Sequence, residues 1–143
     1  VELSPDKPQL TLYSKLTNAT DEPRNACLRS NPKFQLGATN QVTVRFQTVG
    51  GTDESIRLEI PEGKMREALT LSGERLPRGV WEATNSDLGI TLKQTFRLDE
   101  VQTCILDWLP SKARFFMELQ TAERTLAPRE SLVLTQTFDI ATE

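Results

Sequence analysis

The stretch Gln41-Val42-Thr43-Val44-Arg45-Phe46-Gln47 decides the expected fold. Its apolar residues Val42, Val44 and Phe46 alternate with polar ones, so they point to one side of an extended strand. The same alternation returns in four further segments, which are residues 9–16, 55–60, 89–98 and 131–140. β-Branched or aromatic residues, which favour strands, occur in each of them. The pattern predicts a protein built mainly of half-buried strands.

Turn-forming sequences separate these segments, at residues 50–53, 61–63, 76–79 and 84–87. Their spacing is typical of hairpins and meanders. Residues 61–71 also carry a helix-like apolar pattern, but the segment is short, so we expect one helical turn there at most. The predicted fold class is therefore all-β, an antiparallel β-sandwich of about nine to ten strands.

The length and composition indicate one ordinary globular domain. A chain of 143 residues buries roughly 65–70% of its unfolded surface on folding, and we assign residues 1–143 to a single domain. Hydrophobic residues at 37% and charged residues at 26% exclude intrinsic disorder. The formal charge is −3 and the basic residues are scattered singly, so nucleic acid is not an expected partner.

No apolar run approaches the roughly 18–20 residues that a membrane-spanning helix needs, so we expect no membrane span. The N-terminal stretch 1–5, Val-Glu-Leu-Ser-Pro, lacks the charged and apolar regions of a signal peptide. Because Val1 is not a methionine, the sequence leaves the compartment open.

The chain has two cysteines, Cys27 and Cys104, and no histidine. Two distant thiols without an imidazole do not make a zinc framework, and we predict neither a metal site nor another cofactor. The sequence leaves two states open for the cysteines. They either form a disulfide that closes a long loop or remain two separate buried thiols in a reducing cell.

Four short strings carry a resemblance to a known family. They are Leu16-Thr17-Asn18, Asn31-Pro32-Lys33-Phe34-Gln35-Leu36, Phe116-Met117-Glu118-Leu119-Gln120 and Leu126-Ala127-Pro128-Arg129-Glu130. In this order they resemble strings of the galactose mutarotase-like (aldose 1-epimerase-like) β-sandwich family. Asn31 stands where that family has a histidine, and Arg129 stands where glycine is usual. The family fold is about twice as long, so the resemblance implies its C-terminal half only.

The resemblance implies a sugar site in which Glu118 occupies the place of the general base. Sugar mutarotation also needs an imidazole to protonate the ring oxygen, and an Asn31 amide has no proton to give near neutral pH. We therefore expect no conventional epimerase activity from the isolated chain. The predicted function is a non-catalytic or accessory carbohydrate-binding β-sandwich, in which Asn31, Glu118 and Gln120 bind sugar hydroxyls and Trp81 offers a stacking surface.

Other interpretations remain open for these residues. Glu118 could be a solvated residue on the polar side of a strand, Asn31 an ordinary loop residue, and Trp81 part of the core. Asp107, in an apolar stretch, could pair with Glu118 as the two carboxylates of a glycoside hydrolase do.

For the whole chain, the rival prediction is an immunoglobulin-like protein-interaction or structural module. A third possibility is an enzyme completed by a missing half. The expected partner is thus a carbohydrate or another protein.

Overall fold

The computed structural model describes residues 2–3 and 7–142. Part of the N-terminal stretch 1–5, on which the expectation about a signal peptide rests, lies outside the described residues, as do both ends of the predicted domain 1–143. Within the described part the chain forms strands and three 3-10 turns, in the following order. The elements are β1 (Glu2–Leu3), β2 (Gln9–Thr17), β3 (Arg24–Ala26), β4 (Arg29–Ser30), β5 (Lys33–Phe34), η1 (Thr39–Gln41), β6 (Val42–Gln47), β7 (Asp53–Arg57), β8 (Glu67–Ser72), η2 (Gly73–Arg75), β9 (Val80–Asn85), β10 (Ile90–Phe96), β11 (Thr103–Leu109), η3 (Pro110–Lys112), β12 (Arg114–Gln120), β13 (Arg124–Leu126) and β14 (Ser131–Thr142).

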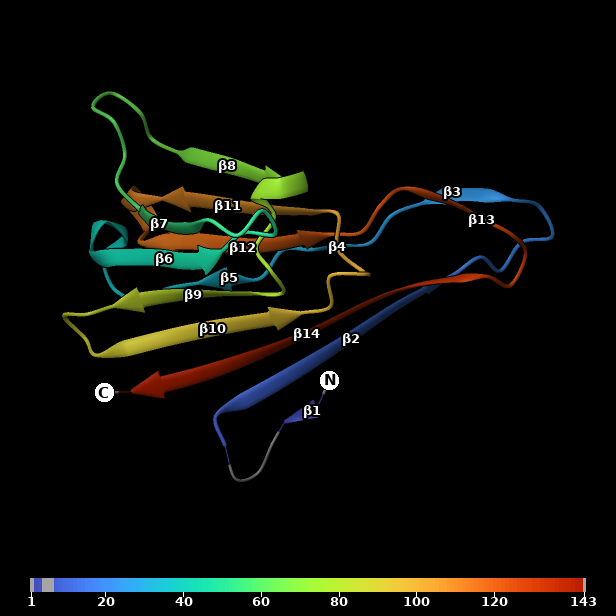
Figure 1. The fold of residues 1–143 in the computed structure, drawn as a ribbon, viewed down its shortest axis with the longest axis horizontal. Helices are drawn as coiled ribbons and strands as arrows, with labels where there is room; N and C mark the ends of the chain where they lie inside the picture. Colours follow the sequence, from blue (N-terminus) through green and yellow to red (C-terminus); the bar gives the residue numbers. More distant parts are fainter. Residues whose placement is uncertain (1, 4–6, 143) are drawn as a thin grey trace.

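These strands form two sheets that pack face to face and a small separate ribbon (Figure 1). The first sheet has seven strands in the order β1-β2-β14-β10-β9-β6-β7, and the second has β4-β12-β11-β8 with β5 also on β12. Their strand pairs are antiparallel. The β3–β13 ribbon projects beyond the sheets. The prediction of an all-β antiparallel sandwich is confirmed.

Each of the five segments with alternating residues overlaps a strand, namely β2, β6, β7, β10 or β14. The expectation for residues 55–60 was too long at its end, because β7 stops at Arg57. Nine strands have five residues or more, which matches the expected nine to ten. The other strands of the described chain have two or three residues, too few for an alternating pattern to be recognised in sequence.

Residues 61–71 contain no helix, which is consistent with the expectation of one helical turn at most. Residues 61–66 are irregular, and Glu67–Ser72 is strand β8, which pairs along its length with β11. In this position backbone hydrogen bonds to a neighbouring strand replace those of a marginal helix. Met65, which would lie on the apolar face of such a helix, is 83% exposed.

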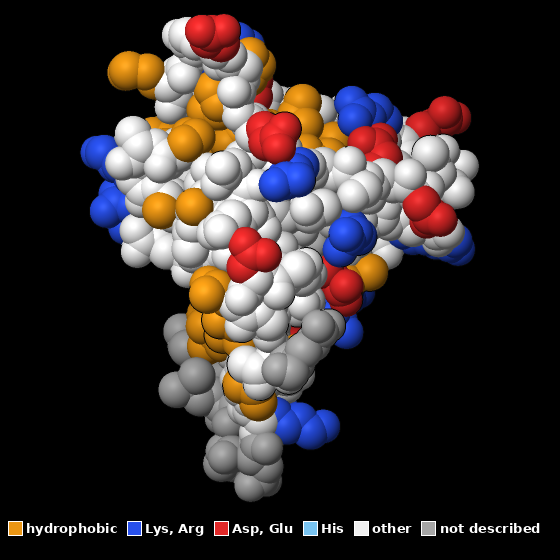
Figure 2. Space-filling view, turned by 90° about the vertical axis from the view of Figure 1, so that its left-hand side faces the viewer, with side chains coloured by type: hydrophobic (Ala, Val, Ile, Leu, Met, Phe, Trp, Pro, Cys, Tyr) orange, Lys and Arg blue, Asp and Glu red, His pale blue; other side chains and the backbone are white. Residues whose placement is uncertain are grey.

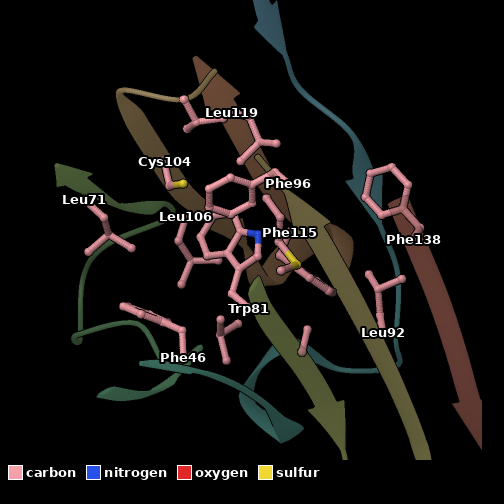
Figure 3. Close-up of a cluster of buried hydrophobic side chains, with 14 of the residues drawn as sticks. Phe46, Leu71, Trp81, Leu92, Phe96, Cys104, Leu106, Phe115, Leu119 and Phe138 are labelled. Atoms are coloured by element: carbon pink, nitrogen blue, oxygen red, sulfur yellow. The ribbon is translucent and has the colours of Figure 1, made fainter. Parts of the chain in front are cut away.

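The core lies between the two sheets. Val42, Val44 and Phe46 are buried on the inner face of β6, as their alternation predicts. The second sheet contributes Phe115 and other apolar side chains of β8, β11 and β12. Figure 3 shows Trp81 in the middle of this cluster.

Cys27 is exposed and Cys104 is buried, and neither is bonded to the other. Of the two alternatives for these residues, the structure has the two separate thiols, but the expectation that both are buried is wrong for Cys27. In the described residues, no helix has the length and apolar character that crossing a membrane requires.

Candidate functional site

Two short edge strands bring Asn31 to the strand that carries Glu118. β4 pairs with β12 through Ser30 and Leu119, and β5 pairs with β12 through Lys33 and Phe116. Asn31 lies between the two short strands, so these registers set it opposite Glu118. Two strings that are far apart in sequence thus meet at one edge of the second sheet.

Glu118 and Gln120 lie on the outer face of this sheet, away from the core. The alternate residues Phe115, Met117 and Leu119 are fully buried on the inner face. Gln120 is half-buried, but Glu118 is only 3% exposed.

Arg29 on β4 binds the Glu118 carboxylate and covers it. Its Nη2 donates to Glu118 Oε2 at 2.7 Å, and its Nε forms an ion pair with Oε1. Gln120 Nε2 donates to the same Oε1 at 3.0 Å. The hydrogen bond and the charge of Glu118 raise the pKa of the Arg29 guanidinium. The alternative of a freely solvated Glu118 is therefore wrong.

Sequence reasoning missed Arg29, whose guanidinium side chain is 57% exposed. No local pattern marks it, since the pairing of Gln120 with Arg29 depends on how β4 docks on β12. The arrangement places the exposed N–H groups of Arg29 at a buried carboxylate, near the exposed Asn31.

Asp107 on β11 is the second carboxylate of this outer face. It lies opposite Phe116, so it is a diagonal neighbour of Glu118, with a typical Cα separation of about 7–8 Å for such positions. Arg66 binds both its oxygens, with Nε donating to Oδ1 at 2.8 Å and Nη2 contacting Oδ2. Since each carboxylate is held by its own arginine, the geometry does not favour a hydrolase pair.

Trp81 is fully buried, and its Nε1 donates to Gln94 Oε1 at 2.6 Å. The ring therefore presents no face to a ligand, and the predicted stacking surface at Trp81 is not available in this structure. The alternative that placed Trp81 in the core describes its position (Figure 3).

Four of the hollows on the described surface have volumes of about 420, 610, 230 and 460 Å³. Asn31, Glu118 and Gln120 line none of these four. The hollow of about 610 Å³ is an apolar groove that includes Leu10, Leu12 and Phe138. Figure 2 shows hydrophobic side chains gathered beside the grey residues at that end of the molecule. Among the residues described, no three Cys, Asp or Glu side chains come together as metal ligands.

Comparison with known proteins shows the fold through structure alone. No family model matches the sequence, and neither does any curated protein. A proposed aldose 1-epimerase from Klebsiella pneumoniae superposes with a TM-score of 0.78 at 10% identity, covering 99% of this chain and 45% of that one. The chain has the mutarotase-like fold.

Two further solved structures have the same fold. The Slr1438 protein from Synechocystis sp. PCC 6803 matches with a TM-score of 0.74 at 14% identity, covering 95% of this chain and 52% of its own. A galactose mutarotase related enzyme from Lactobacillus acidophilus matches with a TM-score of 0.70 at 12% identity. The match covers 94% of this chain and 58% of that enzyme. The chain thus spans about half the length of these mutarotase-like proteins. That this half is the C-terminal one stays a prediction.

Proposed function

We propose that this chain is a non-catalytic or accessory carbohydrate-binding β-sandwich, and that the sheet edge around Glu118 is its binding surface. The observation that carries the proposal is the meeting of Asn31, Glu118 and Gln120 at one edge, with Arg29 added by the fold. Sugar hydroxyls both donate and accept hydrogen bonds. This surface supplies amide donors and acceptors from Asn31 and Gln120 and further donors from Arg29.

The geometry supports binding without epimerase chemistry. The chain contains no histidine, so it lacks the imidazole that would protonate a sugar ring oxygen. Glu118 could act as a base only after releasing Arg29, which contacts both of its oxygens. We therefore expect polarimetry to show that the purified chain does not accelerate the mutarotation of glucose or galactose, and clear acceleration would contradict the non-catalytic role.

The binding test is a screen of monosaccharides and oligosaccharides followed by calorimetry on variants. Asn31→Ala and Gln120→Ala should each weaken binding by about three- to tenfold, the effect of losing one hydrogen bond between neutral groups. Glu82→Gln is the matched control, because Glu82 is exposed on β9 of the other sheet. If no sugar binds at millimolar concentration, or if the control weakens binding equally, the proposal fails.

A second candidate function, docking of further protein structure on this chain, is supported by the apolar groove. The groove adjoins β2. On the side of β2 that faces away from β14, β1 pairs only with Leu10 and Thr11. The rest of that side has no strand partner in the described chain. An occupant with an extended, apolar strand would suit both features. Because the matched structures are about twice as long, we propose that this occupant is further β-structure completing the sandwich.

Hydrogen exchange tests this second candidate. In the product of the complete reading frame that encodes this chain, the amides of β2 should exchange more slowly than in residues 1–143 alone. Equal rates would remove the support for docking. A complex structure should bury more than roughly 1,000 Å² and include the groove residues.

A further inference from the structure

Four side chains, those of Trp81, Gln94, Gln136 and Ser30, form a continuous series of hydrogen bonds through the core. Trp81 and Gln94 are 0% exposed and Gln136 is 1% exposed. Gln94 accepts from the Trp81 indole at 2.6 Å and donates through Nε2 to Gln136 Oε1 at 2.7 Å. Gln136 Nε2 then donates to Ser30 Oγ at 2.5 Å. These hydrogen bonds thereby connect the seven-stranded sheet to edge strand β4 of the second sheet.

The direction of these bonds is fixed from the tryptophan end. An indole N–H can only donate, so the Gln94 oxygen must accept and the Gln94 amide must donate onward. The same logic applies to Gln136, whose NH₂ group therefore points to Ser30. The Trp81 N–H needs only one acceptor, and Gln94 supplies it. This requirement does not explain why Gln136 also donates to Ser30 on β4.

The end point of the chain lies next to the proposed binding surface. β4 has two residues, and successive side chains of a strand point to opposite faces. Ser30 therefore points inward to Gln136 while Arg29 points outward to Glu118. The hydrogen bond to Ser30 fixes β4 from the core side. The same strand carries Arg29 on its outer side.

We propose that Gln136 is a positioning residue that holds β4 through Ser30 and so keeps Arg29 on Glu118. This inference deepens the proposed function and rests on it only in so far as the surface binds a sugar. A core without this link would leave β4 attached through its pairing with β12 and the hydrogen bonds between Leu28 and Thr121.

The first test is local hydrogen exchange, measured by NMR without any ligand. Ser30→Ala removes the acceptor, and Gln136→Leu removes the donor from the other side. Both should speed exchange of the Arg29 Nε–H about fivefold, the effect expected for one lost hydrogen bond. Ser30→Thr keeps the hydroxyl and should restore the wild-type rates. The Arg45 amide on distant β6 should be unchanged in the Ser30 variants.

Ser14→Ala is the matched control, because it removes a half-buried hydroxyl from β2 outside this chain of bonds. If Ser30→Ala leaves the exchange rate of the Arg29 Nε–H no different from that in Ser14→Ala, the positioning role is excluded. Should Gln136→Leu fail to fold, the Ser30 variants decide the question.

Sugar affinity is the second readout, and it separates this inference from the proposed function. For any sugar that binds, Ser30→Ala should weaken affinity about fivefold and Ser30→Thr should not. Faster exchange with unchanged affinity would overturn the positioning role for binding. If no sugar binds the wild-type chain, the proposed function fails, while the exchange experiment still decides whether Gln136 positions Arg29.

Discussion

Arg29 on β4 contacts both carboxylate oxygens of Glu118 on β12, although 89 residues separate them in sequence. The two side chains differ sharply in environment, since the side chain of Glu118 is 4% exposed and the side chain of Arg29 is 57% exposed. The pair therefore neutralises a buried charge with a surface residue.

Replacing Arg29 should expose the cost of that burial. In Arg29→Ala the Glu118 carboxylate is left buried without its cation, and we expect a loss of about 1–3 kcal/mol in the free energy of unfolding, measured by urea denaturation. Arg24→Ala is the control, because Arg24 pairs with Glu22 at 3.4 Å on the open surface, and surface pairs contribute about 0–1 kcal/mol. Equal losses in the two variants would contradict the account of Glu118.

The Glu54–Arg75 pair should make stability depend on pH. Arg75 donates to both oxygens of Glu54, at 2.8 and 2.7 Å, and these hydrogen bonds lower the pKa of Glu54 below its ordinary value. A carboxyl with a lowered folded pKa stabilises the protein above its unfolded pKa and loses this contribution as the pH falls through its folded pKa.

Urea denaturation of wild type and Glu54→Gln, carried out between pH 7 and pH 3, measures this effect. The wild type should be the more stable at neutral pH, and the difference should hold down to about pH 5 and shrink below the unfolded pKa of about 4.3. A difference that stays constant through the acidic range would rule out this origin.

The two thiols should differ in reactivity. Burial raises the pKa of the Cys104 thiol far above its ordinary value, while Cys27 is exposed. Because the thiolate is the reactive form, we expect a thiol reagent at pH 8 to modify Cys27 in the folded protein and Cys104 only after denaturation. Mass spectrometry of the modified protein would show one adduct before unfolding and two after it. Rapid modification of Cys104 in the native state would contradict its burial.

Gly79 should tolerate substitution less well than Gly51. Both have positive φ, 77° and 88°, so alanine costs about 1–2 kcal/mol of backbone strain at either position. A Cβ at Gly79 would also lie 3.1 Å from the Phe96 carbonyl oxygen, whereas a Cβ at Gly51 meets no atom within 4 Å. Thermal unfolding should therefore give a lower Tm for Gly79→Ala than for Gly51→Ala, and the reverse order would be inconsistent with this contact.

The alternating residues of the long strands predicted the fold class because period two is a local property. Val42, Val44 and Phe46 needed only their own spacing to be assigned to one face, and all three are buried. Residues 61–71 could not be assigned in this way, because a short segment fits both periods. The pairing of residues 67–72 with β11 decided for a strand. Trp81 likewise could not be assigned from sequence, because whether an aromatic side chain is buried depends on what packs over it.

The sequence by itself determined an all-β antiparallel sandwich, the lack of an imidazole, and the identity of three residues that meet at one sheet edge. The tertiary structure alone decided that Arg29 covers Glu118, that Arg66 binds Asp107, and that Gln136 reaches Ser30. The physical reason is distance along the chain. Alternation is set by neighbouring residues, whereas charge pairs and buried hydrogen bonds form between strands whose register is fixed only when the two sheets pack.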